Sequence, residues 1–217
     1  MSQKKIEEKL FIISSFMDYT LLEENYPKSI YNFCKKNEIE EKTFYKHFGS
    51  FDAVRKMIWQ SFYNNTMSLL EKDKDFVDSN PKEKLLSFYF TFFEVLLVNR
   101  SYVLFVLSKE EKIQTKMSDL KTLRINFKGF ANELIEEGNI EKPTYLQHSP
   151  RIFSEAAWVQ LSFLLKFWVE DTSESFEKTD QAIEKSVQTA FDVFENTPLS
   201  SLIDFGKFLW KEKFVSS

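Results

Sequence analysis

Length, composition and charge already exclude several classes of protein. The chain has 217 residues, of which 43% are hydrophobic and 29% are charged, and its formal net charge is −4. This balance fits one globular domain, or a small module joined to a larger one, with enough apolar residues for a sizeable core. It disfavours non-specific binding of nucleic acid by the whole chain, which usually shows as a basic excess. The charge is uneven, because residues 1–60 hold ten Lys or Arg against nine Asp or Glu, a net of +1.

The single cysteine, Cys34, excludes an internal disulfide and favours a reducing, cytoplasmic setting. The N-terminal sequence has no signal-peptide layout. Residues 85–107 form the most membrane-like window, but Glu94, Asn99 and Arg100 lie near its middle, where charges are costly in lipid. We therefore expect two core helices that meet at Asn99-Arg100 and no membrane span.

The first quarter of the chain predicts four helices. Apolar residues at three- and four-residue steps predict a helix over about 3–22, with an inward face of Ile6, Leu10, Ile13, Phe16 or Met17, and Leu21. Pro27 opens a short second helix, and a turn follows in which Asn37 suits a left-handed backbone conformation. A third short helix covers about 40–47. Gly49-Ser50 ends it, and a fourth helix begins near Phe51.

Later helices are longer, and prolines mark where three of them begin. Asn80-Pro81, Ser149-Pro150 and Thr197-Pro198 each place a good N-cap before a proline, and Glu83 can complete a capping box with Asn80. The predicted helices cover about 81–98, 100–108, 111–137, 150–171, 176–195 and 198–213. Only 4 glycines, and no long strand alternation, predict an all-α fold of about nine or ten helices.

Residues that could carry catalysis are nearly absent. His47 and His148 are the only histidines, and no pair of His or Cys has metal-ligand spacing. There is no glycine-rich phosphate loop. We therefore expect no catalytic residue, no metal and no cofactor, and an enzyme built on the helical core is the least favoured interpretation.

Residues 27–54, PKSIYNFCKKNEIEEKTFYKHFGSFDAV, predict a short helix, a tight turn, a second short helix, a glycine and a long helix. That order is helix-turn-helix geometry. The stretch resembles the DNA-binding segment of the TetR family of bacterial regulators, over about residues 5–58. Ser29 stands at the family's Thr, Phe33-Cys34 at Ile-Ala, Thr43-Phe44-Tyr45 at Thr-Leu-Tyr, and His47-Phe48 at His-Phe. An ordinary helical hairpin within a bundle is the plainer alternative.

The resemblance implies an N-terminal three-helix helix-turn-helix domain, residues 1–51, and a C-terminal helical ligand-binding and dimerisation domain, residues 52–217. It implies a ligand-responsive transcriptional regulator, a repressor, whose partners are double-stranded operator DNA, an apolar small-molecule effector and a second copy of the chain. The exposed face of the recognition helix would be Thr43, Tyr45, Lys46 and His47, while Phe48 and partly Phe44 face inward. The residues implied at the DNA are Lys28, Ser29, Lys42, Thr43, Phe44, Tyr45, Lys46 and His47.

Departures from the family pattern keep a second function open. Asn37-Glu38 replaces Ala-Gly in the turn, Glu40 replaces the N-cap Ser, and Phe51 replaces a phosphate-binding Lys. Acids beside the recognition helix repel phosphates, and this helix has no Arg for the commonest base contact. The alternative is a protein of the same fold that has lost DNA binding and carries a lipid or other small molecule.

The C-terminal helices predict an assembly surface and a pocket. Residues 153–168 hold five aromatics beside Ala156-Ala157, and residues 187–194 form an apolar stripe. The resemblance implies a dimer through the helices near 150–171 and 176–195, whose wide apolar faces two subunits would cover. It also implies an apolar ligand cavity, for which we expect linings from Phe90, Phe93, Leu97, Trp158, Leu161 and Phe163. Plain core packing is the alternative for each of them.

Overall fold

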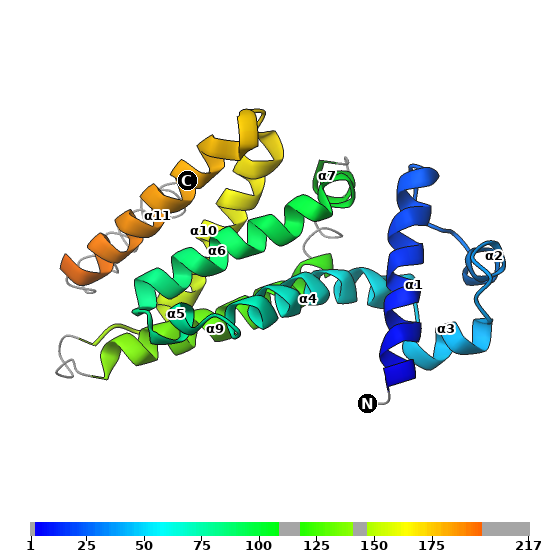
Figure 1. Ribbon diagram of the computed structural model, residues 1–217, viewed down its shortest axis with the longest axis horizontal. Helices are drawn as coiled ribbons and strands as arrows, with labels where there is room; N and C mark the ends of the chain where they lie inside the picture. The colour runs from blue at the N-terminus through cyan, green and yellow to red at the C-terminus, as the bar shows by residue number, and fades with distance from the viewer. Residues whose placement is uncertain (1–2, 109–117, 141–146, 197–217) are drawn as a thin grey trace, which may run out of the picture. The chain divides into compact units, whose positions relative to one another are not determined.

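The computed structural model describes residues 3–108, 118–140 and 147–196. Nearly all of these residues are helical and none lies in a strand, which confirms the predicted all-α fold (Figure 1). The helices are α1 Gln3–Leu22, α2 Ile30–Lys36, α3 Glu41–His47, α4 Phe51–Leu70, α5 Lys74–Asp78, α6 Pro81–Val98, α7 Arg100–Ser108, α9 Lys121–Asn139, α10 Pro150–Glu170 and α11 Glu177–Asn196, with a 3-10 turn Glu174–Phe176 before the last.

Most predicted helix bounds agree closely with these elements, because most of the boundaries are local events. The exception is the helix predicted over about 111–137: α9 begins at Lys121, and residues 111–117 lie outside the described residues. The capping box is present: the Asn80 backbone N–H donates to Glu83 Oε2 at 3.1 Å, and the Glu83 N–H donates to Asn80 Oδ1 at 3.0 Å. Ser149 is the N-cap of α10, but its side chain makes no capping hydrogen bond. The predicted helix over 198–213 and its Thr197-Pro198 start lie outside the described residues.

Two predictions about elements need correction. The five-residue helix α5 was not predicted; Asp73 caps it by accepting from the Asp75 backbone N–H at 3.0 Å. The inward face of α1 was also predicted wrongly at its start, since Ile6 and Leu10 are 42% and 52% exposed. Burial begins at Ile12 and continues through Ile13 and Phe16, as α1 packs on α3, α4 and α7. Periodicity identified the helix but could not show how far its neighbours extend along it.

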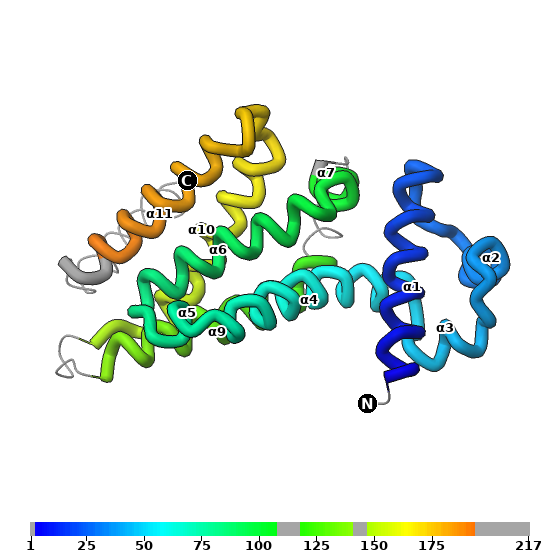
Figure 2. Tube along the Cα trace, viewed as in Figure 1, coloured from blue at the N-terminus to red at the C-terminus, as the bar shows by residue number. Residues whose placement is uncertain are grey.

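The chain divides into two compact units. The first comprises residues 1–72 and 91–127, and the second comprises residues 73–90 and 128–217. The predicted domain boundary between residues 51 and 52 lies inside the first unit and stays a prediction. In the second unit α10 and α11 run antiparallel and side by side, joined by the 3-10 turn (Figure 2).

Hydropathy singles out α10 among the described helices as long and apolar enough to cross a membrane. α6 and α7 pass the same test only as a pair, and they meet at an angle of 95°. The break lies at Asn99-Arg100, as predicted, with the Asn99 N–H donating to the Leu96 carbonyl at 3.0 Å. Core helices of globular proteins pass this test too, and Leu161, Leu164 and Trp168 of α10 are buried in the second unit.

Candidate functional site

The turn between α2 and α3 is a tight C-cap that orients the second helix. The Ile39 N–H donates to the Cys34 carbonyl at 2.8 Å, and the Asn37 N–H donates to the Phe33 carbonyl at 3.1 Å. Glu38 between them has φ 56°, whereas Asn37 has φ −102°. The left-handed residue is therefore Glu38, whereas the prediction had placed it at Asn37. This six-residue hydrogen-bond pattern needs its left-handed residue one position after the C-cap, and Asn37 is the C-cap.

Beneath α3 lies a cluster of aromatic rings. The Phe44 ring is fully buried, with centroids 6.1 Å from Phe33, 6.1 Å from Phe48 and 5.6 Å from Phe51. Phe51 also packs 5.5 Å from Phe16 of α1. Phe48 is buried, as predicted, with 3% exposure. Phe44 packs inward completely, so its ring is not on the exposed side of α3, and Phe51 belongs to this cluster at the position of the family's lysine.

The exposed side of α3 carries polar and cationic groups. Tyr45 is 56% exposed and the Lys46 side chain is 51% exposed. Lys42 is exposed and Thr43 is half-buried. Before α2, Lys28 is exposed, but Ser29 caps that helix by accepting from the Asn32 N–H at 3.4 Å. These hydroxyl and ammonium groups can donate to phosphate oxygens.

His47 is the clearest departure from the predicted exposed face. Its side chain is only 1% exposed, and Nε2 lies 3.0 Å from Oε2 of Glu8 on α1. Lys46 Nζ donates to the same oxygen at 2.7 Å. Hydrogen bonds from Lys46 and then His47 lower the pKa of Glu8 to about 2. Glu8 lies 38 residues from Lys46, so no local pattern could have indicated this contact.

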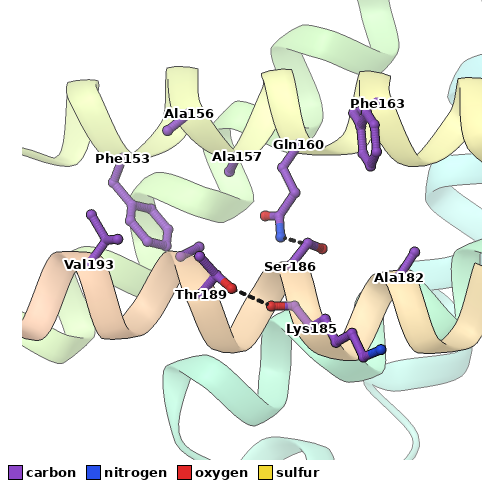
Figure 3. Close-up of a pocket in the computed structure, with 11 residues that line it drawn as sticks. Phe153, Ala156, Ala157, Gln160, Phe163, Ala182, Lys185, Ser186, Thr189 and Val193 are labelled. Atoms are coloured by element: carbon purple, nitrogen blue, oxygen red, sulfur yellow. Dashed lines mark hydrogen bonds between the residues drawn. The ribbon is translucent and has the colours of Figure 1, made fainter. Parts of the chain in front are cut away.

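A second surface lies between α10 and α11 in the other unit. A groove of about 540 Å³ separates the two helices, and Phe153, Gln160 and Phe163 of α10 face Val193, Ser186 and Ala182 of α11 across it (Figure 3). Small residues widen the groove: Ala156, Ala157, Ala182, Ser186, Thr189 and Ala190. Next to the groove, α10 exposes an apolar stripe at helical spacing: Ile152, Ala156, Val159 and Phe163. An exposed apolar face of this kind can be covered by an apolar partner.

One polar bridge crosses the floor of the groove. The fully buried Tyr89 hydroxyl of α6 donates to Gln160 Oε1 at 3.0 Å, and Gln160 Nε2 donates to Ser186 Oγ at 2.9 Å. Burial raises the pKa of Tyr89 well above its ordinary value, so this hydroxyl stays a donor. The bridge ties α6, α10 and α11 together at the middle of the groove.

The residues predicted to line a ligand pocket lie in several environments. Phe163 lines the groove, whereas Leu161 and Phe93 are packed into the cores of their own units. Phe90 and Trp158 are half-buried, and Leu97 is 36% exposed. A cavity shared by these residues stays a prediction. Among the described residues, no cluster of three or more His, Cys, Asp or Glu could hold a metal ion.

Comparisons with known proteins find a matching family and similar solved structures. Residues 84–209 match the family described as "Tetracyclin repressor-like, C-terminal domain". The fold is similar to a crystal structure from Syntrophomonas wolfei str. Goettingen that carries the name of a TetR-family transcriptional regulator. The TM-score is 0.65 at 17% sequence identity, over 88% of this chain and 96% of that chain. A comparison with curated proteins found no match.

Proposed function

The chain belongs to the TetR family of transcriptional regulators, and on that premise we propose that it is a homodimeric repressor that binds operator DNA and is released by an apolar small molecule. In this proposal the protein is a cytoplasmic regulator and has no catalytic role. The observation that carries the proposal is the helix-turn-helix of α2 and α3, held on an aromatic cluster with cations on its outer side.

The recognition helix in this proposal is α3. It is short and rigidly mounted, because Phe44 anchors its inner side and the α2–α3 turn is closed by three backbone and side-chain bonds. Its exposed lysines and Tyr45, together with Lys28 before α2, are donors, and donors to phosphate hold a protein in register on the duplex. In this proposal Thr43 and Tyr45 are the candidates for contacts with base edges.

Dimerisation through α10 and α11 follows from their outer face. In a single copy of the chain, Val159 and Phe163 are exposed to water, at 66% and 57% exposure. A second copy placed by a two-fold axis would cover both, since such an interface pairs a surface with itself. The two recognition helices would then read half-sites about 34–36 Å apart, or a multiple of that distance.

The effector response is a shift between two dimer states. A ligand that binds one state better favours that state by its difference in affinity. A state with the wrong spacing of α3 and its symmetry mate loses one of the two half-sites, and the DNA is released. The apolar character of the C-terminal core favours an apolar effector.

A specific observation favours a second candidate function, a ligand carrier that no longer binds DNA. Glu40 and Glu41 are exposed at the start of α3, and the His47 ring is buried against Glu8 instead of exposed. Each feature lowers the attraction of the helix for phosphates.

A mobility-shift titration on the DNA upstream of the gene separates the two functions. We expect the wild type to bind with a negative salt slope, and Lys46→Ala to make that slope shallower by about one unit per lost contact per subunit. Lys178→Ala, an exposed lysine on α11, is the matched control and should bind like the wild type. If the wild type does not bind at low salt, the repressor is rejected and the carrier takes its place.

A further inference from the structure

One carboxylate oxygen engages both basic groups at the end of the candidate recognition helix. Oε2 of Glu8 accepts from Lys46 Nζ at 2.7 Å and lies 3.0 Å from Nε2 of His47. Glu8 belongs to α1, whereas Lys46 and His47 are consecutive residues in the last turn of α3. Both residues lie in the last turn, where basic side chains interact favourably with the helix dipole.

Burial separates the roles of the two partners. The His47 side chain is 1% exposed, so its contact with Glu8 is enclosed by the protein. The Lys46 side chain is 51% exposed and the Glu8 side chain is 22% exposed, so their pairing takes place at the surface. An exposed lysine exchanges partners readily, because a surface ion pair is worth little in water.

We propose that Glu8, held in place by the enclosed His47, sets the DNA affinity of the protein by competing with backbone phosphates for Lys46. This inference rests on the proposed function. In the free protein the carboxylate takes the place that a phosphate oxygen takes in the complex, since both are anionic acceptors of charge-assisted hydrogen bonds. DNA must displace Glu8, or bind beside it and bear its negative charge.

The surrounding charges make this competition effective. Along residues 40–47 the exposed charges are Lys42 and Lys46 against Glu40 and Glu41, so the helix itself has no net positive charge. Pairing Lys46 with Glu8 leaves a net negative balance in this neighbourhood. Removing the Glu8 carboxylate should therefore raise the affinity of the protein for any DNA sequence.

The test compares two neutralised carboxylates on the same helix. Glu8→Gln removes the competing charge, and Glu7→Gln removes an equal charge from the adjacent, exposed position. The probe is a random-sequence duplex, titrated by fluorescence anisotropy over a series of salt concentrations, because a phosphate contact does not depend on sequence. We expect Glu8→Gln to tighten binding about three- to ten-fold at low salt and to steepen the salt slope by up to about one unit per subunit. Glu7→Gln should tighten it much less.

A structural role for Glu8 predicts the opposite sign, because a loosened recognition helix binds DNA more weakly. The inference is overturned if Glu8→Gln and Glu7→Gln bind DNA with equal affinity, or if Glu8→Gln binds more weakly than the wild type while its thermal transition is intact. In either case, DNA binding by the wild type leaves the proposed function standing. Binding by Glu8→Gln but not by the wild type supports the inference, and binding by neither overturns both.

A further variant, Glu8→Asp, tests the same inference if Glu8→Gln does not fold. Glu8→Asp keeps the charge on a shorter side chain that reaches both partners less well, and we expect a smaller tightening in the same direction. In a Lys46→Ala background the gain from either Glu8 variant should shrink, since the competed group is missing. An unchanged gain in that background contradicts competition at Lys46.

Discussion

The outer side of α3 and the outer side of α10 and α11 are two exposed surfaces made on different principles. α3 carries charged and hydroxyl groups over an aromatic cluster, and its Lys46 is already paired with Glu8. The groove of α10 and α11 has small apolar walls, and Val159 and Phe163 beside it stand in water. A charged surface is stable in water without its partner, because water and neighbouring opposite charges solvate it, whereas a large apolar surface is stabilised only when it is covered. The first therefore suits an occasional partner, such as DNA, and the second a lasting one.

The largest effect should come from removing the anchor of the charged surface. Phe44→Ala empties a fully buried site among Phe33, Phe48 and Phe51, and we expect a loss of about 3–5 kcal/mol in the free energy of unfolding. Tyr45→Ala removes an exposed neighbouring ring and should cost less than about 1 kcal/mol. Urea denaturation followed by circular dichroism measures both. Similar costs for the two variants would show that α3 is not seated on the aromatic cluster.

The next effect breaks the apolar surface without touching the core. Val159→Asp places a charge on the exposed stripe of α10, and we expect the dimer to weaken at least about a hundred-fold, or about 2.7 kcal/mol. Val98→Asp, at a position that is 86% exposed in α6, is the control. Sedimentation velocity across micromolar concentrations gives the dissociation constants. A wild-type monomer in that range would reject the dimer itself, and a dimeric Val159→Asp would move the interface elsewhere.

The stability of the turn between α10 and α11 should depend on pH through Asp171. Asp171 ends α10 and accepts from the Ser173 N–H and Oγ at 2.8 and 2.6 Å and from the Thr179 N–H and Oγ at 3.0 and 2.6 Å. Burial raises its pKa, but these four bonds outweigh burial and lower it to about 2. The group therefore adds stability above the unfolded-state value near 3.9, and this stability is lost as the pH falls towards 2.

Asp171→Asn should cost about 1–3 kcal/mol at neutral pH. Thermal melts from pH 6 to about pH 2 should converge for the variant and the wild type as Asp171 becomes protonated. A difference that persists at the lowest pH would mean that the carboxylate charge is not what holds this turn.

A smaller effect of the opposite sign is expected in the turn under the charged surface. Glu38 holds φ 56°, a conformation that costs a non-glycine residue about 1–2 kcal/mol. Glu38→Gly should therefore stabilise the protein by about 0.5–1 kcal/mol, although the more flexible unfolded chain offsets part of the gain. Asn37→Gly, with φ −102°, should destabilise it. Urea denaturation decides, and stabilisation by Asn37→Gly instead would place the left-handed residue one position earlier.

The smallest effect tests the charge of the recognition surface alone. Glu41→Gln removes an exposed acid from the start of the proposed recognition helix, and we expect DNA binding to tighten only about two- to three-fold, below 1 kcal/mol. Glu177→Gln, an exposed acid in the first turn of α11, should leave binding unchanged. Anisotropy titration at low salt resolves the pair. An ordinary helical hairpin would respond to neither change.

Local interactions account for the elements that could be predicted from the sequence. Asn80 and Glu83 cap α6 through atoms three residues apart, and Asn99-Arg100 breaks the chain between α6 and α7 as the residues there predict. The helix-turn-helix was also readable, because its spacing depends on short helices and one turn. Even the need for a left-handed residue after α2 was foreseen, although it fell on Glu38 and not on Asn37.

Contacts between groups far apart in the chain, in contrast, could be identified only from the folded structure. Glu8 and His47 are 39 residues apart, and their contact turned a predicted exposed histidine into a buried one. The same limit explains why Ile6 and Leu10 stay exposed and why Phe163 lines a groove while Leu161 is packed in the core. Helical period tells which residues share a face, but burial depends on which neighbours cover that face and how far they extend, and those neighbours come from distant parts of the chain.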